Sequence, residues 1–357
     1  MMKALIAMSG GVDSSVAACL MMEKGYECMG ATMRLYDNED IFVPKEKTCC
    51  SLDDVEDARS VAFRLGIPFS VFNFKKEFRE NVIDKFISSY EKGQTPNPCI
   101  ECNRHLKFGK FFARARELGY DYVVTGHYAI RGYNEETGRY YLKKGSDERK
   151  DQSYVLYSLT QEQLEHTLFP LGDFDKTKIR EIAEERGFIN AKKKESQDIC
   201  FIPDGDYVSF LEKERGEKYK PGNFVDVNSG EVLGTHRGII GYTVGQRKGL
   251  GISSTEPYYV CEKRMETNEV ALGRKKDLEV KTLTANDVNW VSVDCPDEKI
   301  RCSAKIRYAH RQQSATAEVL ADGRLLVTFD EPVSGVAKGQ AVVLYDDDLV
   351  LGGGTIE

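Results

Sequence analysis

The sequence has no long hydrophobic run. Its 357 residues are 41% hydrophobic, yet no stretch approaches the run of about 18 apolar residues that a membrane-spanning helix needs. The first residues, MMKALIAMSGG, also lack the basic segment and the long apolar core of a secretory signal. We therefore expect a cytoplasmic protein that does not interact with membranes.

An excess of positive charge is missing as well. The chain has 50 Lys and Arg residues against 57 Asp and Glu residues, a formal net charge of −7. The negative net charge excludes a nucleic-acid-binding surface that is basic throughout. It does not exclude local basic tracts, because binding depends on the local potential. The length indicates two or three domains and a substantial core.

The sequence contains ten cysteines. Because we expect no export signal, these cysteines are expected to be reduced thiols, metal ligands or catalysts rather than a disulfide framework. Cys49 and Cys50 precede a helix start, where we expect a loop or buried role. Other single cysteines are expected to be small buried hydrophobic residues: Cys19, Cys28, Cys261, Cys295 and Cys302.

Strand-like and helix-like segments alternate in the first half of the chain. Ser51 and Asp54 form a capping-box pattern at one helix start. The expected strands are 3–8, 27–35, 67–74 and 120–130, and the expected helices are 12–24, 51–65, 77–93 and 105–118. This alternation predicts an α/β fold with a doubly wound parallel sheet.

The pattern changes to short strands and glycine-rich turns after about residue 200. Asp322-Gly323 predicts a hairpin, and 342–356 reads as another. The expected domains are 1–204, an α/β domain; 205–277, a small mixed β module; and 278–357, a C-terminal β-barrel.

A glycine loop follows the first expected strand. In AMSGGVDSS, residues 7–15, Gly10 and Gly11 let backbone N–H groups approach an anion at a helix N-terminus. Ser9 and Ser14 can donate further hydrogen bonds, and Asp13 can hold a Mg²⁺ that bridges phosphates. The loop has neither the lysine of GxxxxGK[ST] nor the spacing of GxGxxG. It resembles the pyrophosphate-binding loop of the ATP-pyrophosphatase (PP-loop) superfamily, whose members split ATP to AMP and pyrophosphate and adenylate a substrate oxygen.

Motifs along the whole chain make the resemblance closer. They are CCSLDDVEDARSVAFRLGIPFSVFNF (49–74), TPNPCIECNRHLKFG (95–109), VVTGHYA (123–129), KDQSYVLYSL (150–159), DICFI (198–202), YTVGQRKGLGI (242–252) and GQAVVLYDDDLVLGGGTI (339–356). In this order they resemble the bacterial tRNA-specific 2-thiouridylase family, the tRNA-uridine 2-sulfurtransferases. The resemblance implies 2-thiolation of the wobble uridine in tRNAs for Lys, Glu and Gln. It also implies ATP as cofactor and a cysteine desulfurase or sulfur-carrier protein as donor.

The resemblance also implies that 1–204 is the catalytic domain, that 205–277 contacts tRNA and that 278–357 positions tRNA. It further implies site residues. Cys102 matches the catalytic nucleophile and Cys200 the persulfide-bearing partner, a pair that can close a disulfide. The implied ATP-binding residues are Ala7, Met8, Ser9, Gly10, Gly11, Val12, Asp13, Ser14, Met33 and Gly126. The implied tRNA-contacting residues are Asn97, Pro98, Cys99, His127, Lys150, Asp151, Gln152, Arg307, Tyr308 and Gln340.

The chemistry of uridine supports a pair of cysteines. The C2 oxygen is a poor leaving group until adenylation makes it part of AMP. A sulfur nucleophile must then attack the carbon, and a persulfide is more ionised at neutral pH than a thiol. A second cysteine releases the sulfur by closing a disulfide.

Cys99 departs from the family, since many members have aspartate there, a candidate general base. Cys99, Cys102 and Cys200 make three thiolates, enough to hold a [4Fe-4S] cluster with one iron open. A persulfide pair, such a cluster and a structural zinc therefore remain open. The rival functions are an amide-forming PP-loop enzyme and a zinc-dependent RNA-binding protein without catalysis.

Overall fold

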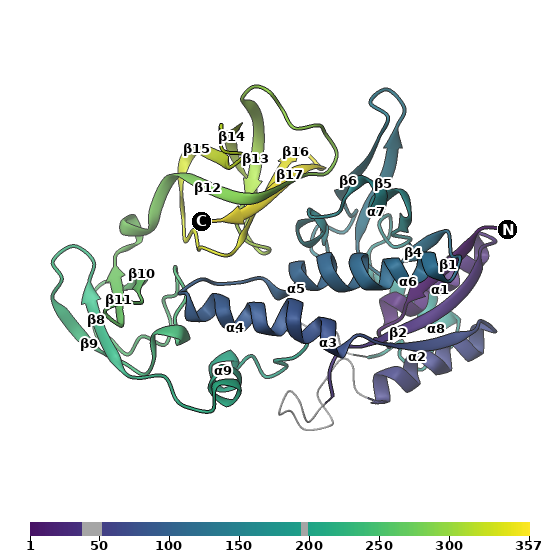
Figure 1. Cartoon of the computed structure of the whole chain (residues 1–357), viewed down its shortest axis with the longest axis horizontal. Coiled ribbons are helices and arrows are strands. Elements are labelled where there is room, and N and C mark those ends of the chain that lie inside the picture. The colour runs from purple at the N-terminus through teal and green to yellow at the C-terminus, as the bar shows by residue number, and fades with distance from the viewer. Residues whose placement is uncertain (38–51, 194–198) are drawn as a thin grey trace.

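The computed structural model describes residues 1–37, 52–193 and 199–357. Two long helical segments run through the middle of the molecule (Figure 1). A parallel sheet lies at one end of them, a small mixed sheet at the other, and a β-barrel beside them. Cys49, Cys50 and Ser51 lie outside the described residues.

The first sheet is parallel throughout, as expected. Its strand order is β3-β2-β1-β4-β7. The strands are β1 (Lys3–Ala7), β2 (Glu27–Arg34), β3 (Phe69–Asn73), β4 (Tyr122–Val124) and β7 (Thr167–Leu168). The order reverses direction between β1 and β4, and a crevice at such a switch point is where open α/β sheets bind ligands.

Helices cover both faces of this sheet. Ala4 and Ile6 of β1 face one core and Leu5 the other, because successive strand residues point to opposite faces. The first core is covered by α1 (Val12–Glu23), α2 (Leu52–Leu65) and α8 (Lys176–Glu185). The second is covered by Phe111, Phe112 and Ala115 of one long helical segment.

The two long helical segments contain π-helical turns. One consists of α3 (Lys75–Phe78), η1 (Arg79–Ile83) and α4 (Asp84–Glu91). The other consists of α5 (Pro98–Glu101), η2 (Cys102–Phe111) and α6 (Phe112–Glu117). The expected start of this helix at residue 105 is wrong. The helix begins at Pro98 because Asn97 caps it by accepting from the Cys99 N–H at 3.1 Å, and proline suits the first helical position.

The expected strand 120–130 is also wrong in extent. It breaks after β4, and the chain resumes as β5 (Ala129–Asn134), which pairs with β6 (Arg139–Lys144) outside the parallel sheet. The break at 125–128 allows the chain to turn against the first loop: a Cβ at Gly126 would lie 2.9 Å from the Ser14 nitrogen.

Short elements follow this hairpin: η3 (Ser153–Leu156), α7 (Gln161–Glu165) and, after α8, α9 (Tyr207–Arg215). The small mixed sheet has the order β10-β11-β8-β9. Its strands are β8 (Gly222–Asp226), β9 (Val232–His236), β10 (Tyr259–Arg264) and β11 (Glu269–Gly273), with η4 (Ile239–Gly241) and η5 (Lys275–Leu278) beside them. β11 and β8 are parallel and the other pairs antiparallel.

The C-terminal barrel has the strand order β12-β15-β14-β13-β16-β17 and is closed by a β12–β17 pairing. Its strands are β12 (Glu279–Trp290), β13 (Ile300–Lys305), β14 (Gln313–Val319), β15 (Leu325–Ser334), β16 (Ala341–Asp346) and β17 (Leu349–Ile356). Both expected hairpins are confirmed. β17 also pairs with β6 at Leu349 and Lys143, which extends the barrel sheet onto the first domain.

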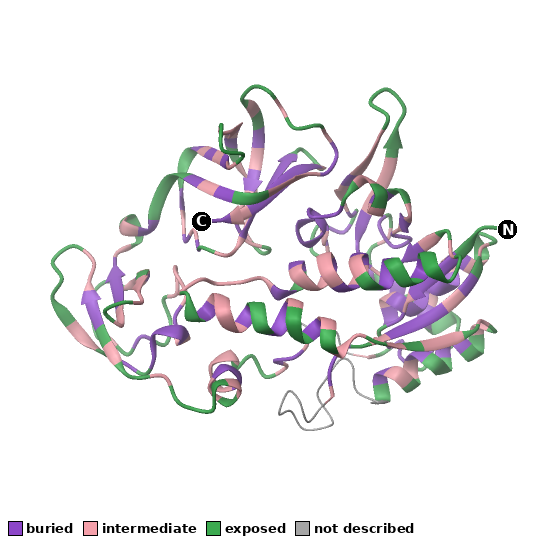
Figure 2. Cartoon of the chain, viewed as in Figure 1, coloured by how far each residue is buried: buried purple, intermediate pink, exposed green. Residues whose placement is uncertain are grey.

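Buried residues line the barrel interior and the parallel sheet, whereas exposed residues follow the outer faces of the helices (Figure 2). Among the described residues, no helix has the length and apolar character to cross a membrane.

Candidate active site

The glycine loop that is expected to bind phosphate occupies the turn between β1 and α1, where the sequence predicts it. Gly10 has φ +74°, and a Cβ there would lie 2.4 Å from the Asp54 carbonyl oxygen, so no other residue fits without a shift. The Ser9 N–H donates to Ser14 Oγ at 3.2 Å, and Ser14 Oγ donates to the Gly11 carbonyl at 3.0 Å. The loop is therefore held in one shape at the positive end of α1, a setting that suits phosphate.

Asp13 has two partners that the sequence does not reveal. Lys176 Nζ lies 2.7 and 2.8 Å from the two carboxylate oxygens, and the Tyr128 hydroxyl donates to Oδ1 at 2.6 Å. Lys176 is only 8% exposed and stands at the start of α8, after its N-cap Asp175. No local sequence pattern predicts that Lys176 forms an ion pair with Asp13, because the two residues come together only in the folded protein.

A pocket of about 310 Å³ joins this loop to the cysteines. It lies at the carboxyl ends of β1, β2 and β4, where ligands of open α/β sheets bind. The lining contains many predicted site residues: Ala7, Met8, Ser9, Asp13, Ser14, Met33, Pro98, Cys99, Cys102, Gly126, His127, Gln152 and Cys200. It also contains Lys107, from the basic tract RHLKFGK, and residues that the sequence analysis does not single out: Thr32, Leu35, Phe78, Val82, Thr125, Ile199 and Phe201.

Other predicted site residues lie outside this lining. Gly10, Gly11 and Val12 shape the loop behind it. Asp151 is buried and accepts from the Ser153 N–H at 3.0 Å and the Gly145 N–H at 3.3 Å. Asn97 caps α5, and the Lys150 N–H donates to the Asp147 carbonyl.

The barrel residues expected to contact tRNA make contacts within the protein. Arg307 Nη2 donates to the carbonyls of Val244 and Gly335, both at 2.6 Å, and so joins the barrel to the segment before β10. Gln340 Nε2 donates to the Thr95 carbonyl at 2.8 Å, just before the cysteine helix. Tyr308 is 42% exposed and lies edge-on to the Tyr154 ring.

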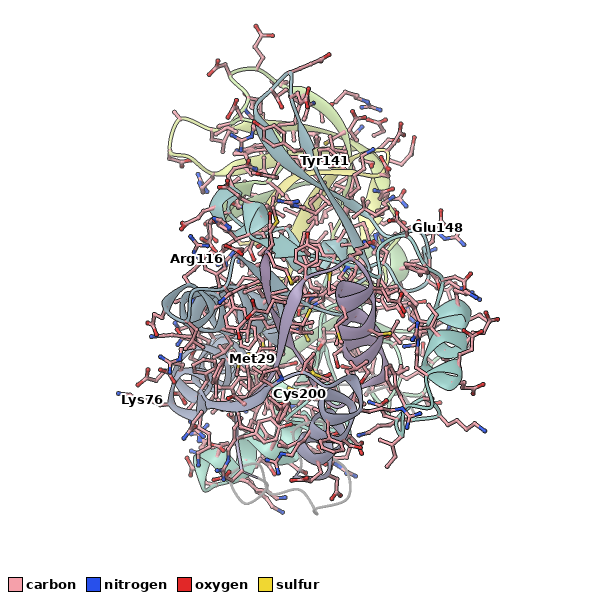
Figure 3. The ribbon with its side chains drawn as sticks, turned by 90° about the vertical axis from the view of Figure 1, so that its right-hand side faces the viewer. Met29, Lys76, Arg116, Tyr141, Glu148 and Cys200 are labelled. Carbon is pink, nitrogen blue, oxygen red and sulfur yellow. The ribbon has the colours of Figure 1, made fainter. Side chains whose placement is uncertain are left out.

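The three candidate cysteines reach the pocket from two parts of the chain. Cys99 lies in the first turn of α5, and Cys102 follows three residues later in the same helical segment. Cys200 comes from the segment after α8, and its carbonyl accepts from the Tyr36 hydroxyl at 2.8 Å (Figure 3 labels Cys200). Within residues 1–37, 52–193 and 199–357, no group of three or more His, Cys, Asp or Glu residues is placed to hold a metal ion.

Most of the remaining cysteines are packing residues. Cys19, Cys28 and Cys302 are buried, and burial raises the pKa of each to about 11. Burial also raises the pKa of Cys261, which is half-buried, to about 11. Cys295 is exposed, so the expectation of burial is wrong there; it lies in the loop between β12 and β13, outside both strands.

His127 is a buried imidazole at the bottom of the pocket. Its Nδ1 lies 2.7 Å from Thr125 Oγ1 and its Nε2 lies 3.3 Å from Lys107 Nζ. Burial, reinforced by the Lys107 charge, holds the pKa of His127 well below 6.5, so the ring is neutral at pH 7.

Comparison with known proteins adds independent findings to this geometry. Family models match three consecutive parts of the chain: a tRNA methyl transferase HUP domain over residues 2–204, a tRNA methyl transferase PRC-barrel domain over 208–274 and an aminomethyltransferase beta-barrel domain over 280–356. The fold and the matches thus define a nucleotide-binding α/β domain followed by two β domains.

Curated relatives narrow this class. The tRNA-specific 2-thiouridylase MnmA of Clostridioides difficile (strain 630) is 50% identical over 355 residues, covering 99% of this chain and 98% of the relative. The protein of that name from Clostridium beijerinckii is 51% identical over 355 residues, with 99% and 98% covered. A solved 4-thiouridine synthetase–RNA complex with bound ATP is 23% identical, covers 59% of this chain and 50% of that chain, and has a TM-score of 0.34. The chain belongs to the family of tRNA-specific 2-thiouridylases.

Proposed function

We propose that this protein uses ATP to replace the C2 oxygen of the wobble uridine in tRNA with sulfur. The observation that carries the proposal is the single pocket that holds both the phosphate loop and Cys99, Cys102 and Cys200. An amide-forming enzyme would not need thiols beside its phosphate loop, and an RNA-binding protein without catalysis would not need the loop.

ATP would bind with its phosphates on the loop from Ala7 to Ser14 and its adenine beside Met33. Gly126 lets its own segment pack closely against this loop, since a Cβ at that position would lie 2.9 Å from backbone atoms of Asp13 and Ser14. Mg²⁺ would be held by Asp13 together with the phosphates and would neutralise part of their charge. Asp13 fits this role if Lys176, now bound to its carboxylate, moves to a phosphate oxygen.

The uridine would enter beside Pro98, Cys99 and Gln152, flipped out of the anticodon loop. Single-stranded loops splay their bases at low cost, which suits a pocket of this size. The C2 oxygen then attacks the α-phosphate of ATP, pyrophosphate leaves, and the base carries a good leaving group.

Sulfur transfer would follow between Cys102 and Cys200. Cys200 carries the persulfide, whose terminal sulfur attacks C2, and the C2–O electron pair leaves with AMP. The Cys102 thiolate attacks the inner sulfur and closes a Cys102–Cys200 disulfide, which leaves the transferred sulfur on uridine. A sulfur donor, a cysteine desulfurase or a carrier protein, would reload Cys200 after the disulfide is reduced.

A [4Fe-4S] cluster on Cys99, Cys102 and Cys200 fits the pocket less well. All three line the pocket, but no metal-holding group of three is found in the described parts of the chain. We therefore assign the sulfur chemistry to thiols. Iron and acid-labile sulfide content after anaerobic purification tests this choice, and stoichiometric amounts of both would overturn it.

The proposal as a whole is tested with unmodified tRNA of the Lys, Glu and Gln types, ATP, Mg²⁺ and a persulfide donor. We expect pyrophosphate release that depends on tRNA and 2-thiouridine detectable by mass spectrometry of digested tRNA. Pyrophosphate release that does not depend on tRNA, with no thiolated nucleoside, would contradict it.

A further inference from the structure

Lys107 is a cation in the pocket without an assigned role. It lies on η2 and lines the same pocket as Gly126 of the loop after β4 and Cys102 at the start of η2. Neighbouring lysines have carboxylate partners: Lys85 pairs with Glu101 and Lys176 with Asp13. No ion pair among the described residues includes Lys107, so its charge is available for an anion that enters the pocket.

His127 fixes the direction of this ammonium group. An ammonium is only a donor, so the Nε2 that lies 3.3 Å from Lys107 Nζ must accept. The ring proton then sits on Nδ1 and is donated to Thr125 Oγ1 at 2.7 Å. His127 is only 6% exposed and packs against the Phe108 and Phe169 rings, so this acceptor is held in place.

The proposed reaction changes the negative charge of one group, the α-phosphate that joins AMP to the uridine. In the adenylated uridine, the phosphate is a diester with one negative charge. When sulfur attacks C2, the C2–O bond breaks, its electron pair stays on the oxygen, and AMP leaves as a monoester with a second negative charge. A cation that contacts this phosphate therefore binds the departing group more strongly than the intermediate.

We propose that the Lys107 ammonium, positioned by His127, binds the α-phosphate of the adenylated uridine and stabilises AMP as it leaves. Lys107 is then a catalytic residue and His127 a positioning residue. This inference rests on the proposed function, because it assigns the charge stabilisation within that reaction.

Binding of AMP and of adenosine to the full-length protein tests the contact directly. Lys107→Met should weaken AMP binding about 10- to 100-fold, the usual effect of a charge-assisted hydrogen bond, and leave adenosine binding unchanged. Lys107→Arg should keep part of the preference for AMP. Lys76→Met is the matched control: its side chain is 82% exposed and points away from the protein in Figure 3, so neither ligand should be affected. Equal AMP affinity in wild type and Lys107→Met would overturn the inference.

Single-turnover kinetics separate this inference from the proposed function. With persulfide-loaded protein, Lys107→Met should slow AMP release about 10²- to 10³-fold. Pyrophosphate release should slow less, so adenylated tRNA accumulates. If wild type forms no 2-thiouridine, the proposed function fails. If wild type is active and Lys107→Met releases AMP at the wild-type rate, only the inference fails.

The positioning role needs its own readout. His127→Leu removes the acceptor and should slow AMP release with little change in ATP affinity, whereas His127→Gln offers an amide oxygen and should recover part of the rate. Loss of ATP binding in both variants would show a structural role and contradict this part. Lys107→Met tests the phosphate contact even if His127→Leu fails to fold.

Discussion

The two ends of the molecule use their predicted site residues differently. At the nucleotide end, Ser9, Asp13 and Ser14 line the pocket where a ligand would bind. At the barrel end, Arg307 and Gln340 donate to backbone carbonyls of other segments. Replacing the first group should therefore remove chemistry, whereas replacing the second should disturb how the barrel, the mixed sheet and the cysteine helix are held together.

The largest effect is expected from the thiols. Cys102→Ala and Cys200→Ala should each lower thiolation about 10³-fold or more, as removal of a nucleophile does, because neither sulfur release nor disulfide closure can proceed. Pyrophosphate release that depends on tRNA should persist in both, since adenylation needs neither thiol. Cys295→Ala, an exposed cysteine outside the pocket, is the control and should keep full activity. Full thiolation by Cys102→Ala would contradict the assignment.

A second large effect is expected at the Asp13–Lys176 pair. Asp13→Ala should abolish tRNA-dependent pyrophosphate release while tRNA still binds. Lys176→Met should slow the release about 10²- to 10³-fold. Lys178→Met, two residues further on α8 with an exposed side chain, should have no effect.

The pair also has a stability signature. Asp13→Ala leaves a buried ammonium without its carboxylate, which costs about 3–5 kcal/mol in the free energy of unfolding. The double variant Asp13→Ala/Lys176→Met should regain much of that stability and none of the activity. A stable, active double variant would show that neither residue takes part in ATP cleavage.

Local sequence patterns predicted most of the elements and the place of the glycine loop after the first strand, because both depend on residues close together in the chain. The loop shape follows from Gly10, which alone tolerates φ +74° against Asp54. The helix start at Pro98 could have been predicted as well, since Asn97-Pro98 is a capping signal.

Other parts of the site could not be predicted from sequence patterns. Lys176 meets Asp13 only because α8 packs on α1, and Lys107 of η2 meets His127 of the segment after β4 only in the folded protein. Without the family resemblance, nothing in the sequence brings Cys200 to Cys102. Contacts between distant segments are set by packing, which no local pattern encodes.

Arg307 should have an intermediate effect that tests the barrel end. Arg307→Ala removes two hydrogen bonds from a half-buried guanidinium and should lower the free energy of unfolding by roughly 2–4 kcal/mol. Affinity for tRNA should fall because the barrel and the mixed sheet lose a connection, while ATP affinity is kept. Arg301→Ala removes an exposed pair with Asp330 and is the control. If Arg307→Ala lost ATP binding and kept its tRNA affinity, the assignment of Arg307 to the barrel end would be wrong.

A smaller effect is expected at Cys99. With thiol chemistry at Cys102 and Cys200, Cys99→Ser should retain measurable thiolation, and Cys99→Asp should be tolerated or faster because it supplies a carboxylate that can act as a general base. Loss of activity in both variants, together with loss of bound iron, would instead support a cluster, since a serine oxygen is a poor iron ligand.

The smallest effect is a pH dependence of stability from His127. The pKa of His127 in the folded protein lies well below 6.5, its ordinary value in the unfolded chain. At a pH between these two pKa values, the unfolded chain binds a proton that the folded protein does not. Stability should therefore fall as pH drops below about 6.5, with a slope of at most about 1.4 kcal/mol per pH unit from this residue. His105, His236 and His310 also have lowered pKa values, so the informative quantity is the difference between wild type and His127→Gln. Lys107→Met should narrow the pH range of this dependence only slightly, because burial is the larger cause of the lowered pKa of His127 and the Lys107 charge the lesser one. Identical unfolding profiles of wild type and His127→Gln between pH 5 and 7 would mean that His127 titrates in the folded protein as it does in the unfolded chain, which would contradict the buried neutral imidazole that directs Lys107.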